Sequence, residues 1–253
     1  MSTSIATGLE DAARVFLAAE WRDLVMLNYA VDPALVEPLV PPGTELDFFE
    51  GRAYISLVGF RFLHTAVLGF RIPFHQDFEE VNLRFYVRSK HHSPSRRGVV
   101  FIREIVPLRA VAAVARLVFN ENYVRLPMSH RITGGTHEHR GPRETEYSWR
   151  SAGSWNRVRV VTEGESFYPA DQSAQQFISE HYWGYCRQNE TESLEYEVQH
   201  PPWRVWTARE ARFEGDATAL YGAAFAEVLR RQPQSALLAE GSPVTVFKGT
   251  KII

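Results

Sequence analysis

The clearest pattern in the chain is a strict alternation of polar and apolar side chains over residues 80–88, EVNLRFYVR. Successive side chains of a β-strand point to opposite sides of the sheet, so a period of two predicts a strand. One face is apolar, and the other carries groups that bind ions and donate hydrogen bonds: Glu80, Asn82, Arg84, Tyr86 and Arg88. Alternation alone leaves open whether this polar face meets bulk water, as in many half-exposed antiparallel strands, or lines a pocket.

Further strands are predicted where apolar, aromatic and β-branched residues cluster between turn residues. These segments are 21–31, 46–49, 53–62, 99–106, 155–161, 194–200 and 244–247, with a hairpin across 130–151. Helices are predicted at 9–20, 33–39, 107–119, 173–187 and 217–231, and residues 64–77 are predicted to form a loop. Because the strands are spread along the chain without an internal repeat, we expect one domain over 21–253, with residues 1–20 as an N-terminal segment packed on it.

Composition places the chain among globular proteins and narrows its partners. Of its 253 residues 45% are hydrophobic and 13% aromatic, and the formal charge of -2 comes without a long basic run, so no nucleic-acid partner is expected. The single cysteine, Cys186, cannot form an internal disulfide and suits a reducing compartment. The opening residues lack the basic and apolar parts of a secretion signal, and no apolar run approaches the ~18 residues that span a bilayer. We therefore expect a cytoplasmic protein without a membrane partner.

The strongest candidate site combines the polar face of 80–88 with Glu104 from the following predicted strand. Arg84 can grip a carboxylate through two parallel N–H donors, and a glutamate in a dry site can have its pKa raised into the range of a proton donor or acceptor. Asn82 and Tyr86 would fix the orientation of a ligand, with Glu80 beside them. This site requires one particular pairing of the two strands, because a slip by one residue sends Glu104 to the other face.

Histidines supply weaker candidates. His200 precedes two prolines whose restricted backbone would hold it in place, and Trp203 could form a pocket wall, although a surface histidine beside a packed tryptophan explains the same pattern. His181 falls on a helical apolar face and is interpreted as a core histidine. His137 and His139 would share one strand face, but they lie in a Gly-rich charged turn without carboxylate or cysteine partners, so no metal site is predicted.

Sequence motifs of common cofactor and nucleophile sites are missing. The chain has no GxSxG, no GxGxxG and no GxxxxGK[ST], so neither a nucleophile elbow nor a nucleotide-binding loop is predicted. We therefore expect no cofactor.

Several motifs, in the same order along the chain, resemble those of one family. They are LVPPGTELDFFEGRAYISLVGFRF at 39–62, NLRFYVR at 82–88, GVVFIREIVP at 98–107, AVAAVARLVFNENYVRLPM at 110–128, ISEHYWGYC at 178–186 and VQHPPW at 198–203. From about Trp21 to about Arg231 the chain resembles the YqjF-like family, bacterial proteins of unknown function within the acetoacetate decarboxylase-like superfamily.

The resemblance implies an α+β fold that is mainly antiparallel β, with a closed or nearly closed β-barrel, flanking helices and an enclosed ligand pocket. It therefore favours a pocket, rather than bulk water, for the polar face of 80–88. Decarboxylases of the superfamily use a lysine that forms a Schiff base, but the matching region here, 120–128, contains no lysine. Lys90 stands in a polar turn and is a poor substitute, so imine-forming decarboxylation is not expected.

Three functional hypotheses follow, each tied to fold-level similarity. The first is an enzyme that acts on an oxo or hydroxy carboxylic acid or a similar polar ligand, with Arg84 and Glu104 as catalytic residues. Its ligand-binding residues would be Glu80, Asn82, Tyr86, Tyr182, His200 and Trp203. The second is a non-catalytic barrel that binds or senses a small apolar or aromatic ligand, which the many aromatic residues favour. The third is a purely structural protein with a filled interior; whether the chain forms a homo-oligomer is left open.

Overall fold

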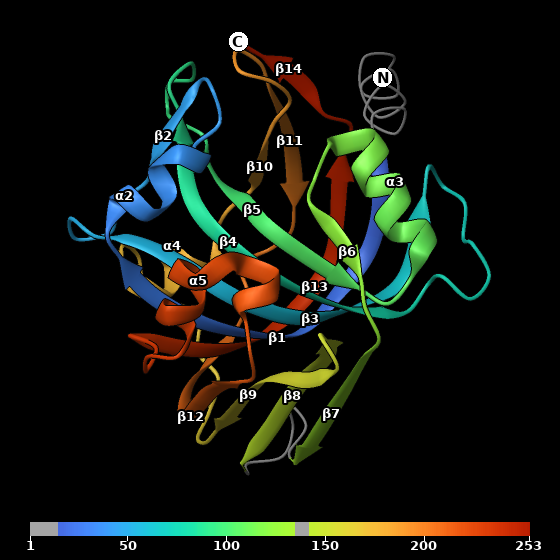
Figure 1. Ribbon diagram of the computed structural model, residues 1–253, viewed down its shortest axis with the longest axis vertical. Helices are drawn as coiled ribbons and strands as arrows, with labels where there is room; N and C mark the ends of the chain where they lie inside the picture. The colour runs from blue at the N-terminus through green and yellow to red at the C-terminus, as the bar shows by residue number, and fades with distance from the viewer. Residues whose placement is uncertain (1–14, 135–141) are drawn as a thin grey trace, which may run out of the picture.

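The alternating segment lies within strand β4 (Phe78–Ser89), and both faces of that strand are buried for most of its length. The computed structural model describes residues 15–134 and 142–253 (Figure 1). Strand β4 pairs antiparallel with β3 (Ala53–Val67) on one side and with β5 (Arg97–Val106) on the other. Glu80 and Asn82 are each 2% exposed, and Arg88 near the strand end is exposed. The polar face therefore lies inside the protein rather than in bulk water.

Strand β4 belongs to a mostly antiparallel sheet that closes on itself. Around the ring the neighbours are, in order, β11 (Ser193–Gln199), β10 (Trp183–Arg187), β5, β4, β3, β1 (Val15–Val31) and β13 (Ser235–Phe247). Pairing of Val198 with Val246 joins β11 to β13 and closes the ring. Strands β10 and β5 pair in parallel, and the other neighbours in the ring pair antiparallel. The protein thus has the α+β, mainly antiparallel fold that the resemblance implied, a closed or nearly closed β-barrel with flanking helices.

A second group of strands continues the sheet from β13 and covers the apolar face of β4. It consists of β12 (Val205–Glu214), β9 (Ser154–Thr162), β8 (Arg143–Ser151) and β7 (Met128–Gly134), which lie at the bottom of Figure 1. Tyr147 and Trp149 of β8 share one hydrophobic core with the apolar side chains of β4 and with helix α5 (Thr218–Leu229). Gly59 on β3 permits this close approach, because a Cβ atom there would stand 2.8 Å from the ring of Tyr147.

Short elements complete the described part of the chain. They are α2 (Pro33–Val36), the 3-10 helix η1 (Glu37–Leu39), β2 (Thr44–Leu46), α3 (Arg109–Phe119), β6 (Tyr123–Arg125), α4 (Ala174–Ser179) and β14 (Thr250–Ile252). Two of these helices have side-chain N-caps: Asp32 accepts a hydrogen bond from Ala34 N, and Ser173 accepts one from Gln176 N. Across residues 15–134 and 142–253, no helix has both the length and the apolar character needed to cross a bilayer.

Two predicted helices are wrong in part. Residues 15–20 were expected at the end of a helix, yet they begin strand β1, which continues past position 20. This part of the expected N-terminal segment therefore belongs to the barrel, and residues 1–14 lie outside the described residues. The helix predicted over 173–187 ends at Ser179, and residues 183–187 form β10. In both segments pairing with neighbouring strands outweighs local helix propensity, since β1 pairs on both sides and β10 pairs with β5 and β11.

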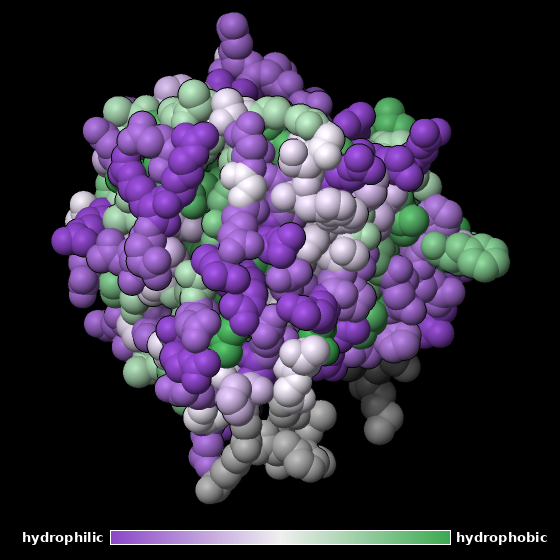
Figure 2. All heavy atoms as spheres, turned by 60° about the horizontal axis from the view of Figure 1, so that its bottom comes forward, coloured by the Kyte–Doolittle hydropathy of each residue, from purple (hydrophilic) through white to green (hydrophobic). Residues whose placement is uncertain are grey.

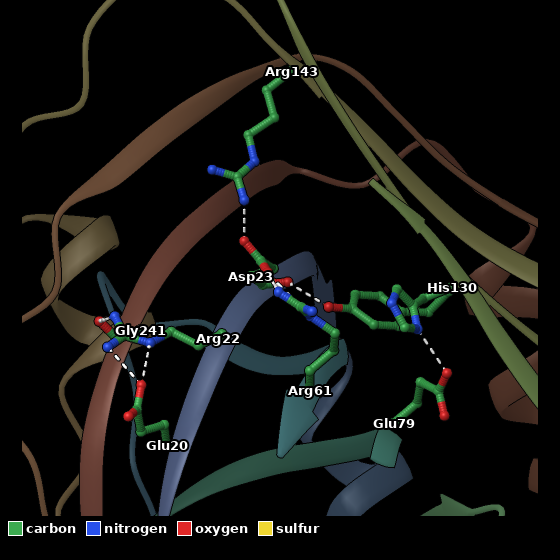
Figure 3. A network of polar contacts seen from close by, with 9 residues as sticks. Glu20, Arg22, Asp23, Arg61, Glu79, His130, Arg143 and Gly241 are labelled. Carbon is green, nitrogen blue, oxygen red and sulfur yellow. Dashed lines mark hydrogen bonds and ion pairs between the residues drawn. The ribbon is translucent and has the colours of Figure 1, made fainter. Parts of the chain in front are cut away.

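A buried aspartate ties the ring to the second group of strands (Figure 3). Asp23 interrupts β1 with a left-handed backbone (φ 60°), which aspartate tolerates better than most residues, and it is 4% exposed. Its carboxylate accepts hydrogen bonds from Arg61 of β3 and Arg143 of β8, while Tyr147 OH donates to its backbone oxygen at 3.0 Å. One carboxylate therefore bridges two guanidinium groups from two parts of the sheet.

Replacing Asp23 with asparagine tests this linkage. An asparagine would keep the side-chain size and the tolerance of a left-handed backbone, but it would leave Arg61 and the largely buried Arg143 without a counter-charge. We expect the Asp23→Asn variant to lose about 2 to 4 kcal/mol in free energy of unfolding, measured by urea denaturation.

Glu20→Gln is the matched control for this prediction. The Glu20–Arg22 pair of the same strand is about one-third exposed on each side, at 31% and 29%, so its loss should cost less than about 1 kcal/mol. Equal losses in the two variants would contradict the proposed role of Asp23.

Candidate functional site

The ring of strands encloses a cavity of about 180 Å³. Side chains of β1, β3, β4, β5, β10, β11 and β13 line it, together with side chains of α3 and of the β3–β4 loop. Most of the lining is apolar. The charged or hydrogen-bonding side chains that line it are Thr65, His75, Glu80, Asn82, Arg84, Glu104, Glu121, Tyr123, His181 and Tyr196, in addition to the indoles of Trp21 and Trp183. An apolar cavity with a few polar groups is the usual form of a small-molecule site.

The pairing of β4 with β5 brings the predicted residues together. Asn82 stands opposite Glu104, and a bulge between Leu83 and Arg84 then shifts the register so that Arg84 stands opposite Phe101. Directly opposed residues of paired strands share a face. Glu80, Asn82, Arg84 and Glu104 therefore line the same cavity.

Three buried carboxyl groups lie close together in this cavity. Glu80 accepts hydrogen bonds from Asn82 Nδ2 and from Tyr123 OH, both at 3.0 Å. Glu121 accepts one from Tyr196 OH, and Glu104 and Glu121 are close enough for each carboxyl to influence the pKa of the other. Burial and the mutual repulsion of these carboxyl groups favour their protonated forms.

Burial governs the protonation of this group. Loss of solvent raises the pKa of Glu80 to about 7 and that of Glu121 to about 8. The pKa of Glu104 lies well above its ordinary value, first because the carboxyl is buried and then because Glu121 and Glu80 disfavour a third negative charge. Both effects favour the protonated form of Glu104.

Several polar atoms of the cavity have no hydrogen-bond partner among the described residues. Arg84 Nη2 donates to the backbone oxygen of Ile178 at 3.1 Å, but Arg84 Nε has no acceptor. Asn82 Oδ1 and Glu104 Oε2 lack donors in the same way. Buried polar groups are usually paired. These free donors and acceptors are thus available to a bound ligand.

His181 differs from the interpretation of a satisfied core histidine. It is 8% exposed and lines the cavity, and neither ring nitrogen makes a well-formed hydrogen bond within the described residues. Burial, followed by the positive charges of Arg97 and Arg84, lowers the pKa of His181 well below its usual value. A neutral imidazole therefore faces the cavity beside Arg84.

The remaining candidates lie behind the cavity wall. Tyr86 does not line the cavity: its hydroxyl is 2.5 Å from Ser56 Oγ, and its ring packs against His181 at 4.7 Å between centroids. His200 stacks on Trp203 at 4.1 Å and contacts the ring of Tyr182 at 4.9 Å. This aromatic group reaches the cavity through Trp21, which contacts both His200 and Trp203 and lines the space itself.

Glu121, Tyr123 and Tyr196 are site residues that sequence reasoning missed. Glu121 follows Asn120, which ends α3 in a left-handed conformation (φ 59°), and Tyr123 pairs with Glu104 through the three-residue strand β6. A strand this short shows no readable alternation, so the only sequence signal was the spacing of Glu121 and Tyr123 by two residues. Tyr196 comes from β11, on the far side of the ring from β4.

The described lining of the cavity includes neither a lysine nor a group of metal ligands. Lys90, Lys248 and Lys251 are the lysines of the chain, and none of them lines the cavity. Within the described segments no three His, Cys, Asp or Glu side chains are grouped to hold a metal ion. His137 and His139 lie outside the described residues, and His130 Nδ1 is 2.6 Å from Glu79 Oε1 on the surface.

Comparison with solved structures shows the same fold in acetoacetate decarboxylase-like enzymes. An acetoacetate decarboxylase from Legionella pneumophila is 12% identical, with a TM-score of 0.66 over 94% of this chain and 87% of that one. The enduracididine biosynthesis enzyme MppR, complexed with pyruvate, is 14% identical, with a TM-score of 0.65 over 93% and 90%. An acetoacetate decarboxylase-like enzyme from Sphingomonas wittichii RW1 is 13% identical, with a TM-score of 0.64 over 95% and 94%.

Sequence comparison identifies the family. The uncharacterized protein YqjF of Bacillus subtilis (strain 168) is 26% identical over 190 residues, which are 74% of each chain. The family model DUF2071, described as an uncharacterized conserved protein (COG2071), matches residues 18–243. The chain therefore belongs to the DUF2071 family, and it shares its fold with acetoacetate decarboxylase-like enzymes.

Proposed function

We propose that this protein is a small-molecule enzyme that transfers protons on an oxo or hydroxy carboxylic acid inside the barrel, without a Schiff-base lysine. The observation that carries the proposal is the buried acid pair Glu104 and Glu121 in the same cavity as Arg84, whose Nε has no acceptor among the described residues. Strongly perturbed carboxyl groups in a cavity favour acid–base catalysis. No metal or nucleotide cofactor is part of the proposal.

The charge balance of the cavity favours an anionic ligand at Arg84. Burial and the neighbouring carboxylates favour the protonated form of Glu104, and the raised pKa values of Glu80 and Glu121, about 7 and about 8, keep these two partly protonated near neutral pH. The negative charge that faces Arg84 is thereby reduced. A substrate carboxylate would accept a charge-assisted hydrogen bond from Arg84 Nε.

Proton transfer can then proceed without redox chemistry. Glu104 donates its proton to the oxo oxygen of the bound acid, while an ionised carboxylate, Glu80 in this proposal, takes a proton from the adjacent carbon. The C–H electron pair forms the C=C bond of the enol, and the C=O π pair takes up the donated proton. Donor and acceptor end with exchanged protonation states, and a proton shift within the carboxyl cluster resets them.

Other residues would position the substrate in this scheme. Asn82 accepts a hydrogen bond from a substrate hydroxyl through Oδ1, and neutral His181 contacts the polar end of the ligand. Tyr86 supports His181 from behind, while Tyr182, His200 and Trp203 support the cavity wall through Trp21. The structurally similar enzyme MppR forms a complex with pyruvate, which supports an oxo acid as ligand.

A non-catalytic binding barrel is the alternative, and the largely apolar lining favours it. Such a protein would bind a small apolar or aromatic ligand and release it unchanged. The two functions differ in whether a bound oxo acid exchanges the hydrogen atoms next to its oxo group with solvent.

Ligand stabilisation tests the anion site. We expect at least one acid from a panel of small 2-oxo and 2-hydroxy acids to stabilise the protein by about 2.7 kcal/mol at 100 times its Kd, which raises the Tm by several degrees. Arg84→Met should abolish this shift while the variant remains folded. Arg88→Met, on the exposed end of the same strand face, should retain it; loss of the shift in both variants would exclude a specific anion site at Arg84.

Hydrogen exchange tests the proton transfer. In D2O the wild-type protein should speed the NMR-detected loss of the C–H signal beside the oxo group, and Glu104→Gln should slow that rate by about 100-fold or more. Glu45→Gln, an exposed glutamate that does not line the cavity, should leave the rate unchanged. Binding without any exchange in the wild type would decide for the binding barrel.

The raised pKa values also predict a pH-dependent stability. The pKa of Glu121 is higher in the folded than in the unfolded state, so at pH values between the two the folded protein binds more protons. The free energy of unfolding therefore falls as pH rises from 4.5 to about 8. Glu121→Gln should remove the share of this loss that Glu121 contributes, on the order of 2 to 4 kcal/mol between pH 5 and pH 8.5 in urea titrations, while Glu80 and Glu104 retain theirs.

Glu227→Gln on the exposed side of α5 is the control, and its pH profile should follow that of the wild type. A Glu121→Gln profile parallel to the wild type would mean that Glu121 titrates like an ordinary surface carboxyl.

A further inference from the structure

A continuous aromatic surface lines the cavity next to the carboxyl cluster. It consists of Trp21, Phe60, Phe62 and Phe78, called here the aromatic wall. Neighbouring rings of the wall are in contact, with centroid distances of 5.3 Å for Trp21 and Phe60, 5.2 Å for Phe60 and Phe62, and 4.7 Å for the stacked pair Phe62 and Phe78.

The strand register joins this wall to the polar group. On β3 and β4, Phe60 stands opposite Glu80, and Phe62 stands opposite Phe78. Moving along β4 from Arg84 toward Phe78, the cavity therefore changes from hydrogen-bonding to aromatic within a few residues. A ligand that fills it must be polar at one end and apolar at the other.

The size of the cavity sets the size of the apolar end. At about 180 Å³ it is comparable to the apolar cavity of about 150 Å³ in which benzene binds. A three-carbon acid held at Arg84 would leave much of the aromatic wall against water, which is unfavourable, whereas a phenyl-sized group would cover it.

The entrance to the cavity is apolar as well. Phe70 and Ile72 of the β3–β4 loop and Val114 of α3 line it, and their exposed fractions are 76%, 45% and 37%. In Figure 2 a hydrophobic side chain projects at the right edge, on the side where Figure 1 shows the β3–β4 loop. Exposed apolar side chains that border a cavity mark a route for apolar ligands.

From these observations we infer that the substrate is a carboxylic acid with an apolar body about the size of a phenyl ring. Its acid group points to Arg84, and its body lies against the aromatic wall. This inference rests on the proposed function, because it takes the anion site at Arg84 as the anchor. It adds that short-chain acids such as pyruvate are poor ligands of this cavity.

Calorimetric titration with two probes tests the inference. Phenylpyruvate and pyruvate share the 2-oxo acid group and differ by a phenyl ring, so their comparison isolates the apolar body. We expect phenylpyruvate to bind at least about tenfold more tightly than pyruvate, the gain that burial of a phenyl group supplies.

Two alanines of α3 provide matched variants. Ala115 lines the cavity, whereas Ala113 is exposed on the same helix and does not. Ala115→Phe should weaken phenylpyruvate about tenfold and change pyruvate less than about twofold, and Ala113→Phe should leave both affinities unchanged. If Ala115→Phe does not fold, the comparison of the two acids on the wild-type protein still decides the question.

The outcomes separate this inference from the function on which it rests. Equal affinities for the two acids, both lost in Arg84→Met, would overturn the apolar-body inference and leave the anion site standing. Phenylpyruvate binding that is undiminished in Arg84→Met would overturn the anion site and the inferred orientation. Failure of both acids to bind the wild-type protein would overturn the two proposals together.

Discussion

The pairing of β4 with its two neighbours is the constraint on which the rest of the structure depends. Side chains alternate between the faces of a strand, so the register decides which of them enter the barrel. The β3–β4 register places aromatic side chains next to Glu80, and the β4–β5 register places Glu104 opposite Asn82. A shift by one residue at either pairing would exchange the polar lining of the cavity for the apolar core beneath β8 and α5.

The electrostatics of the cavity follow from that geometry. Three carboxyl groups from β4, β5 and the segment after α3 meet in a space from which most water is excluded, and a single guanidinium stands beside them in the cavity lining. Ionised carboxylates cannot crowd together without solvent, so they retain protons. The same burial keeps His181 neutral. Proton storage is therefore a property of where the strands put these side chains.

Much of this arrangement could be predicted from the sequence because β4 is long and regular. The unbroken alternation over residues 80–88 identifies both a strand and its two faces, and family resemblance then assigned the polar face to the interior. Glu121 and Tyr123 were not predicted as site residues, because β6 has three residues, too few to show a period. The strand over residues 183–187 was not predicted for a different reason. It depends on pairing with β5 and β11, which are distant in sequence, rather than on local propensity. The bulge between Leu83 and Arg84, which shifts the register so that Arg84 stands opposite Phe101, likewise could not be predicted from the residue pattern.

Carbon-13 NMR of the glutamate side-chain carboxyls tests the central claim, that the cavity stores a proton at neutral pH, most directly. In a protein labelled at glutamate, the account predicts at least one carboxyl resonance in the protonated position at pH 7, and the loss of that resonance in Glu104→Gln. If every glutamate of the wild-type protein titrated near its ordinary pKa of about 4.3, the stored proton, and the acid–base role assigned to Glu104, would be contradicted.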